Sequence, residues 1–311
     1  MIEAKNLTKK YGDKTAVDDL TFTVQPGIVT GFLGPNGAGK STTMRMILGL
    51  DAPTGGTVTV GGKPYRKHTR PLQVVGALLE ARAVHTSRSA YNHLLALAAT
   101  HGITKNRVAE VIEMVGLQDV ARKRAGGFSL GMGQRLGIAS ALLADPETLI
   151  LDEPVNGLDP EGIRWIRDLL KGLAADGHTV FVSSHLMSEM ALTAEHVIVV
   201  GRGRLMADMP MSELIAQASS SAVLVRSPQA RALADALVAP DITVARTAHD
   251  TLEVTGLTAA QIGDRARDLH LSLHGLAPKQ ASLEEAFMEM TRDEVEYHAH
   301  TPTNHLVRSA S

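Results

Sequence analysis

The hydrophobic pattern of the first part of the chain indicates strands. Val29–Leu33 is a short apolar run of the kind that forms a buried strand, and Thr57–Val60 alternates before the turn residues Gly61 and Gly62. We expect short strands through residues 1–60. Between residues 89 and 120 the apolar positions recur at helical spacing instead: Leu94, Leu97, Ala98, Val108, Val111, Ile112 and Val115.

Strand and helix then alternate. Leu149–Leu151 is an apolar strand, Asp159 and Pro160 form a helix start, Gly177 ends that helix, and Val180–Ser183 is the next strand. The positions of the helix expected to face inward are Ile163, Ile166, Leu170 and Leu173. This order predicts a parallel α/β sheet that an all-helical insertion interrupts.

A linker-like stretch at residues 218–221 separates a second pattern from the first. The elements expected beyond it are strand Ala222–Arg226, helix Gln229–Val238, strand Ile242–Arg246, strand Thr251–Thr255, helix Ala259–Leu269 and strand His270–Gly275. This β-α-β-β-α-β order predicts a small ferredoxin-like module. A capping box at Ser282 and Glu285 predicts one more helix. Residues 293–311 form a polar tail, and its three histidines, His298, His300 and His305, are expected to be disordered rather than bound to a metal.

Composition narrows the class of protein. The length of 311 residues favours one large domain with a smaller appendage. The absence of cysteine excludes disulfides and thiol chemistry, and a net charge of −2 does not indicate a nucleic-acid or lipid-surface binder. No apolar run approaches the ~18 to 20 residues that a helix needs to cross a bilayer, and the mixed N-terminus does not resemble a signal peptide. We therefore expect a soluble chain that stays inside the cell.

A phosphate-binding loop follows the strand that ends at Leu33. Residues 34–41 match the pattern G-x-x-x-x-G-K-[ST], with a helical pattern behind them. Glycines let backbone N–H groups converge on phosphate oxygens, and the positive end of the helix points at the same anion. Lys40 supplies a charge for the β- and γ-phosphates, and the Ser41 hydroxyl can bind Mg²⁺. The candidate nucleotide-binding residues are Gly34, Pro35, Asn36, Gly37, Ala38, Gly39, Lys40, Ser41 and Thr42.

Two carboxylates end the strand Leu149–Leu151. Asp152 is placed to hold Mg²⁺ and Glu153 to polarise the attacking water. The phosphate loop and the carboxylates together predict a nucleotide-binding site with Mg²⁺. They do not indicate which class of enzyme carries it, because kinases, GTPases and helicases share the loop.

The segment Phe128–Arg135 makes the resemblance specific. It precedes a helical run and is similar to the signature of the ABC ATPase family, which reads LSGGQ; the resemblance covers residues 1–215. Ser129 and Gly131 fall on signature positions, which implies contact with the γ-phosphate bound by the opposite subunit. Leu130 and Met132 depart from the signature. The implied fold is an α/β P-loop NTPase cassette over residues 1–217, with a parallel sheet core, an antiparallel β subdomain and a helical insertion at about 82–123. Residues 222–292 would be the α+β ferredoxin-like C-terminal module.

The resemblance also implies roles for four single residues. Asp159 belongs to the loop that crosses the dimer interface, His185 matches the histidine that senses the γ-phosphate, and Tyr11 matches the aromatic residue that stacks on adenine. Glu80 takes the place of a glutamine that links the Mg²⁺ site to the membrane subunit. This variation resembles the branch associated with bacitracin, lantibiotic and other antibiotic export.

The resemblance implies a homodimer or heterodimer of ATPase subunits with composite sites. It would dock on separately encoded integral-membrane permease subunits at the cytoplasmic face of the membrane and power export, with no nucleic-acid partner. The competing hypothesis is a soluble ABC-family ATPase that acts on ribosomes or DNA; such proteins carry two cassettes or a long coiled coil, and this sequence shows one phosphate loop and no extended heptads. A non-hydrolysing scaffold would lack Lys40 or Glu153, and both are present.

Overall fold

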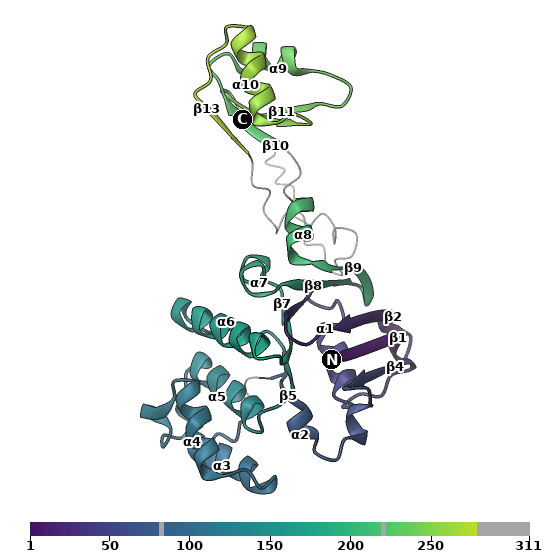
Figure 1. Ribbon diagram of the computed structural model, residues 1–311, viewed down its shortest axis with the longest axis vertical. Helices are drawn as coiled ribbons and strands as arrows, with labels where there is room; N and C mark the ends of the chain where they lie inside the picture. Colours follow the sequence, from purple (N-terminus) through teal and green to yellow (C-terminus); the bar gives the residue numbers. More distant parts are fainter. Residues whose placement is uncertain (81–83, 219–221, 279–311) are drawn as a thin grey trace, which may run out of the picture.

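The computed structural model describes residues 1–80, 84–218 and 222–278 (Figure 1). A six-stranded sheet forms the centre, in the order β5-β6-β7-β3-β8-β9, with only β9 antiparallel. Its strands are β3 Val29–Leu33, β5 Val75–Leu78, β6 Thr148–Leu151, β7 Thr179–Ser184, β8 His196–Gly201 and β9 Arg204–Pro210. The parallel sheet predicted from the apolar runs is confirmed, and β3, β6 and β7 are buried along their whole length, as strands covered on both faces are.

A second sheet, antiparallel and of order β2-β1-β4, is formed by β1 Ile2–Tyr11, β2 Lys14–Val24 and β4 Gly55–Val60. The expectation of short strands was wrong for β1 and β2, which are 10 and 11 residues long. Register shifts break the ladder between them at three points, so strict alternation never runs through either strand. Phe22 of this sheet packs with Phe32 and Phe181 of the central sheet, with ring centroids 5.0 to 6.0 Å apart.

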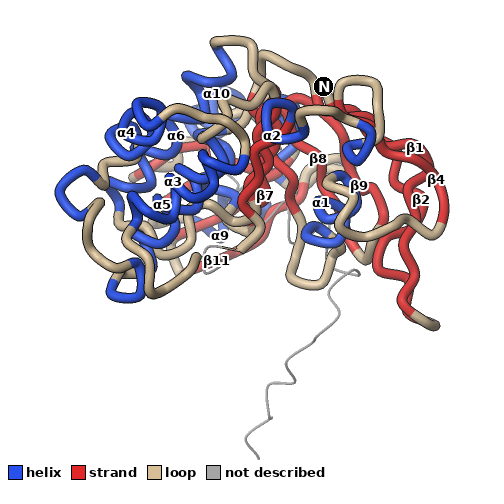
Figure 2. Tube along the Cα trace, turned by 90° about the horizontal axis from the view of Figure 1, so that it is seen from below, coloured by secondary structure: helices blue, strands red, loops and turns tan. Residues whose placement is uncertain are grey.

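Helices cover the side of the central sheet that faces away from the antiparallel sheet, as Figure 2 shows. The predicted insertion contains α3 Ala90–Thr100 and α4 Lys105–Met114, and α5 Leu130–Leu142 packs against both. Ser89, Thr104 and Ser129 cap these three helices through their hydroxyls. The other helices of this part are α1 Lys40–Ile47, α2 Pro71–Val74, α6 Pro160–Ala175, α7 Met187–Thr193 and α8 Met211–Ala218, with 3₁₀ turns at Tyr65–Lys67, Gln118–Val120 and Ala125–Gly127.

Of the four positions expected to face inward on α6, Ile166 and Leu170 are buried, whereas Ile163 and Leu173 are half-buried at the edges of the apolar face. Asp159 caps this helix, as predicted: its Oδ1 accepts a hydrogen bond from the Gly162 N–H at 2.9 Å.

The C-terminal strands form a separate sheet of order β11-β12-β10-β13 with its own apolar core. The elements are β10 Ala222–Arg226, α9 Ala230–Leu237, β11 Thr243–Ala248, β12 Thr251–Thr255, α10 Ala259–Asp268 and β13 Gly275–Pro278. The order of elements matches the predicted ferredoxin-like module. The last predicted strand, His270–Gly275, was wrong. His270 takes a left-handed conformation with φ 57° and Leu271 bonds back to α10, so the strand begins only at Gly275.

Three predictions lie outside the described residues: the start of the insertion at Arg82, the helix at Ser282, and the histidine-bearing tail. Within the described ranges no helix is both long and apolar enough to span a membrane.

Candidate active site

The phosphate-binding loop joins β3 to α1 as a tight turn that depends on glycine. Gly37 and Gly39 have φ of 85° and 98°, values that side chains strongly disfavour. A Cβ atom on Gly39 would lie 2.5 Å from the carbonyl oxygen of Ala16, and one on Gly34 would lie 2.4 Å from that of Val200. The loop is therefore held closely against its neighbouring strands, and helix α1 begins directly after it at Lys40.

Lys40 is 7% exposed and is the charge at the centre of this loop. Its Nζ donates to the carbonyl oxygens of Gly34 and Pro35, at 2.6 and 3.3 Å, and lies 3.9 Å from Oε1 of Glu153. Burial lowers the pKa of Lys40, and the nearby charges of Glu153 and Asp152 oppose that shift. A partly desolvated cation attracts phosphate more strongly than a hydrated one does.

Asp152 lies between two hydroxyls. Ser41 donates to its Oδ2 at 2.5 Å, and Ser183 of β7 donates to its Oδ1. The Ser183 oxygen also accepts the backbone N–H of Glu153 at 2.9 Å, which fixes the end of β6 against β7. Ser41 and Asp152 line the pocket together as two hard oxygen donors, a set that suits Mg²⁺ completed by phosphate oxygens and water. The described residues contain no cluster of three or more metal-ligating side chains.

Glu153 joins the phosphate loop to the predicted sensor histidine. Its backbone is left-handed, with φ 51°, and this turns the side chain toward the loop. One carboxylate oxygen faces Lys40, and the other pairs with Nδ1 of His185 at 2.7 Å. The Glu153 carbonyl accepts a hydrogen bond at 3.2 Å from Gln134 of α5, a side chain only 2% exposed. A carboxylate placed in this way can orient water and accept its proton.

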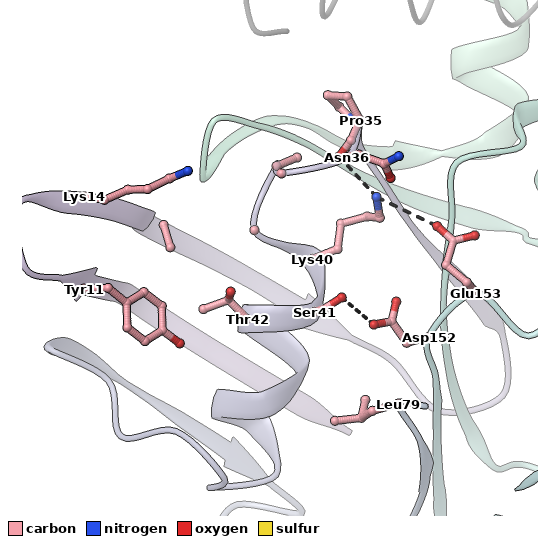
Figure 3. A pocket seen from close by; sticks show the side chains of 14 residues that line it. Tyr11, Lys14, Pro35, Asn36, Lys40, Ser41, Thr42, Leu79, Asp152 and Glu153 are labelled. Atoms are coloured by element: carbon pink, nitrogen blue, oxygen red, sulfur yellow. Dashed lines mark hydrogen bonds and ion pairs between the residues drawn. The ribbon is translucent and has the colours of Figure 1, made fainter. Parts of the chain in front are cut away.

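Lys40, Ser41, Asp152 and Glu153 line a cavity of about 490 Å³, drawn in Figure 3. Tyr11 lies on the side opposite Asp152 and Glu153, with the phosphate loop between them. Sequence reasoning missed four residues here: Lys14, Ala16 and Leu79, which line the cavity, and Gln134. Lys14 had a usable signal, since it follows Tyr11 across a two-residue turn at the start of β2.

Six predicted site residues do not line this cavity. Two of them adjoin it: the Gly34 carbonyl accepts from Lys40, and His185 pairs with Glu153. The other four lie elsewhere. Ser129 caps α5 and lines a separate cavity of about 280 Å³. Gly131 on the same helix packs against the backbone of Gly157, and Asp159 caps α6. Glu80 lines another cavity, of about 490 Å³, between α1, β5, α3 and α5. The structure therefore brings together the phosphate loop, both carboxylates, His185 and Tyr11, and leaves the signature on a different surface.

Three features define a P-loop nucleotide hydrolase. They are a phosphate loop between a buried strand and a helix, two carboxylates at the end of a second strand, and a histidine that pairs with Glu153. The helical layer with its separate capped helix α5 narrows the class to ATP-binding cassettes.

Comparison with known proteins identifies the family. The family described as "ABC transporter" matches residues 17–156, and one described as "Domain of unknown function" matches residues 221–284. The bacitracin transport ATP-binding protein BcrA of Bacillus licheniformis is 45% identical over 217 residues, which cover 69% of this chain and 71% of that protein. The linearmycin resistance ATP-binding protein LnrL of Bacillus subtilis is 33% identical over 310 residues, covering 94% and 98%.

Among solved structures, a dimeric ATP-binding cassette in a post-hydrolysis state, bound to ADP and Pi, is similar with a TM-score of 0.62 at 26% identity, covering 68% of this chain and 99% of that one. The chain thus belongs to the ABC transporter family as an ATP-binding protein with the cassette fold, and it is an ATPase.

Proposed function

We propose that this chain is the motor of an exporter that removes antibiotics or other hydrophobic or peptide-like compounds from the cell. The observation that carries the proposal is the arrangement of Glu153, with Lys40 on one carboxylate oxygen and His185 on the other, beside the Ser41–Asp152 pair. The named activities of the relatives support the substrate class, because they include bacitracin transport and linearmycin resistance.

In this proposal each residue acts on one part of the nucleotide. The loop N–H groups and Lys40 bind the phosphates, and Tyr11 stacks on adenine. Ser41 and Asp152 would hold Mg²⁺, which would supply charge neutralisation on the phosphate oxygens. Glu153 accepts the proton of the attacking water, and His185 keeps that carboxylate oriented through its 2.7 Å hydrogen bond. Such chemistry consists of positioning and charge stabilisation, so no nucleophilic side chain is needed.

The active unit in this proposal is a dimer. Ser129 and Gly131 lie outside the phosphate pocket of their own chain, and the N-terminus of α5 is a favourable place for an anion. A second cassette would place these residues, together with Asp159, on the γ-phosphate across the interface. Glu80 would then act at the cavity between α1 and α3, where a separately encoded permease reaches the ATPase.

The proposed domain division is an ATPase domain over residues 1–217 and an accessory module over residues 222–292. The proposed location is the cytoplasmic face of the cell membrane, where the permease subunits anchor the chain. The competing hypothesis of an ATPase acting on ribosomes or DNA gains no support from the relatives, whose names are those of transport and resistance proteins.

Co-expression tests the proposal. The chain is produced in a sensitive host together with a candidate permease, and the inhibitory concentrations of bacitracin and of linearmycin are measured. Protection should appear with the wild type and vanish with Lys40→Ala. Equal protection by both would mean that ATP does not power it, and no protection against any compound tested, despite ATP hydrolysis, would contradict export.

A further inference from the structure

We propose that Asp51 is a positioning residue for the nucleotide base, because it holds the ring of Tyr11 in one orientation and ties it to the helix of the phosphate loop. The inference rests on the proposed stacking role of Tyr11. It adds a residue outside every motif that the sequence analysis singled out.

The Tyr11 hydroxyl has a defined partner although the residue is 48% exposed. It donates to Oδ2 of Asp51 at 2.9 Å, and the same oxygen accepts from Nε of Arg45 at 2.8 Å. The second oxygen of Asp51 accepts from Nη2 of Arg45 at 3.4 Å. Hydrogen bonds from Arg45 and then Tyr11 lower the pKa of Asp51, while burial and the bond to Asp51 raise the pKa of Tyr11. Acceptor and donor therefore keep these roles around neutral pH.

The ring itself is held by Lys9, two positions earlier in the same strand. Lys9 places its Nζ 4.8 Å from the centroid of the Tyr11 ring, and this ammonium group donates to the carbonyl oxygen of Ala52 at 2.7 Å. Asp51 thus holds the hydroxyl, and Ala52 holds the Lys9 ammonium group that lies over one face of the ring. Both contacts come from the same short segment. A stacking base would take the face that Lys9 does not cover.

Asp51 also joins this ring to the phosphate site. Its backbone N–H bonds to the Arg45 carbonyl at 3.3 Å, so side chain and main chain are both held by α1, the helix that begins with Lys40 and Ser41. In Figure 3 the Tyr11 hydroxyl points toward this helix. Helix α1 thereby sets the distance between the Tyr11 ring, on which the base would stack, and the phosphate-binding loop. ATP must span this distance.

Without the hydrogen bond to Asp51, only Lys9 would hold the exposed ring. The ring would be more mobile, and ATP would lose affinity in ordering it. Fixing one mobile side chain is worth roughly a two- to tenfold change in dissociation constant. We expect Tyr11→Phe and Asp51→Asn each to weaken ATP binding by about that factor, and the double variant to weaken it no further, because both changes remove the same contact. Inorganic tripolyphosphate, which has no base, should bind all variants alike. Asp18→Asn is the matched control, since Asp18 pairs with Arg204 at 2.9 Å away from the cavity.

The experiment is isothermal calorimetry of ATP and of tripolyphosphate with these variants and with Tyr11→Ala. If Tyr11→Ala leaves ATP binding unchanged, the stacking role of Tyr11 is wrong, and the inference with it. If Tyr11→Ala weakens ATP binding but Tyr11→Phe and Asp51→Asn do not, Asp51 has no positioning role. Equal loss of tripolyphosphate affinity would also overturn the proposal, because it would show a general disturbance of α1. The hydroxyl deletion in Tyr11→Phe lies on the surface, so the test does not depend on whether Asp51→Asn folds normally.

Discussion

The side chain of Glu153 offers the sharpest test of the catalytic geometry. Glu153→Gln keeps the volume and one oxygen of the carboxylate but removes its charge, so it cannot accept a proton from water. Loss of a positioned general base lowers the rate by roughly 10²- to 10⁴-fold, which corresponds to about 3 to 5 kcal/mol in the barrier. ATP affinity should stay equal or rise, because the substitution removes a negative charge 3.9 Å from the Lys40 ammonium that binds the phosphates.

The assay is steady-state phosphate release together with equilibrium ATP binding. Glu80→Gln is the control, since Glu80 lines the neighbouring cavity and the resemblance to the family implies a glutamine at this place. It should change basal turnover by less than about tenfold, or roughly 1.4 kcal/mol. Its effect should instead fall on stimulation by the permease. If Glu80→Gln abolishes basal turnover while Glu153→Gln leaves it intact, the base has been assigned to the wrong residue.

Three further outcomes are expected. Lys40→Ala and Ser129→Arg chains, each inactive alone, should recover part of the ATPase activity when mixed, because one intact composite site then forms; full activity of an isolated monomer would contradict this. A chain that ends at Ala218 should bind ATP with near-normal affinity in calorimetry, and a folded truncation that has lost binding would show that the C-terminal module completes the site. Gln134→Leu should cost about 0.5 to 1.5 kcal/mol in urea unfolding, because the part-buried carbonyl of Glu153 loses its donor; unchanged stability would mean that this hydrogen bond contributes little.

The fold was predictable where a local rule decides each element. The apolar run Val29–Leu33 and the Asp159–Pro160 helix start are found as expected, because burial on both faces and capping are properties of neighbouring residues. The last strand of the C-terminal module was misplaced by several residues. Its boundary depends on pairing with β10 and on a left-handed His270, and neither is visible in an alternating pattern.

The site was predictable where a sequence motif directly identifies the residues that bind phosphate or carry the carboxylates. The phosphate loop and the two carboxylates lie together as their residue types require. Gln134 and Asp51 were missed because they act through tertiary contacts. Gln134 is a buried polar residue on a helix, and its partner is a backbone carbonyl 19 positions away. Asp51 follows the turn after α1 as an ordinary polar loop residue, and only the fold shows that Tyr11 reaches it.

In the proposed dimer, Gln134 would connect the two halves of the composite site within one chain. It lies on α5, whose N-terminus carries Ser129, and its amide holds the carbonyl of Glu153 at 3.2 Å. A displacement of α5 by a nucleotide bound in the partner subunit would therefore pull on the residue that orients water in the first subunit's own pocket. Glu153 is held in a left-handed backbone conformation between Gln134 and Ser183, so a movement of either contact would act on the direction of its carboxylate. Hydrolysis at one site would then depend on occupancy of the other through a hydrogen bond rather than through a large rearrangement.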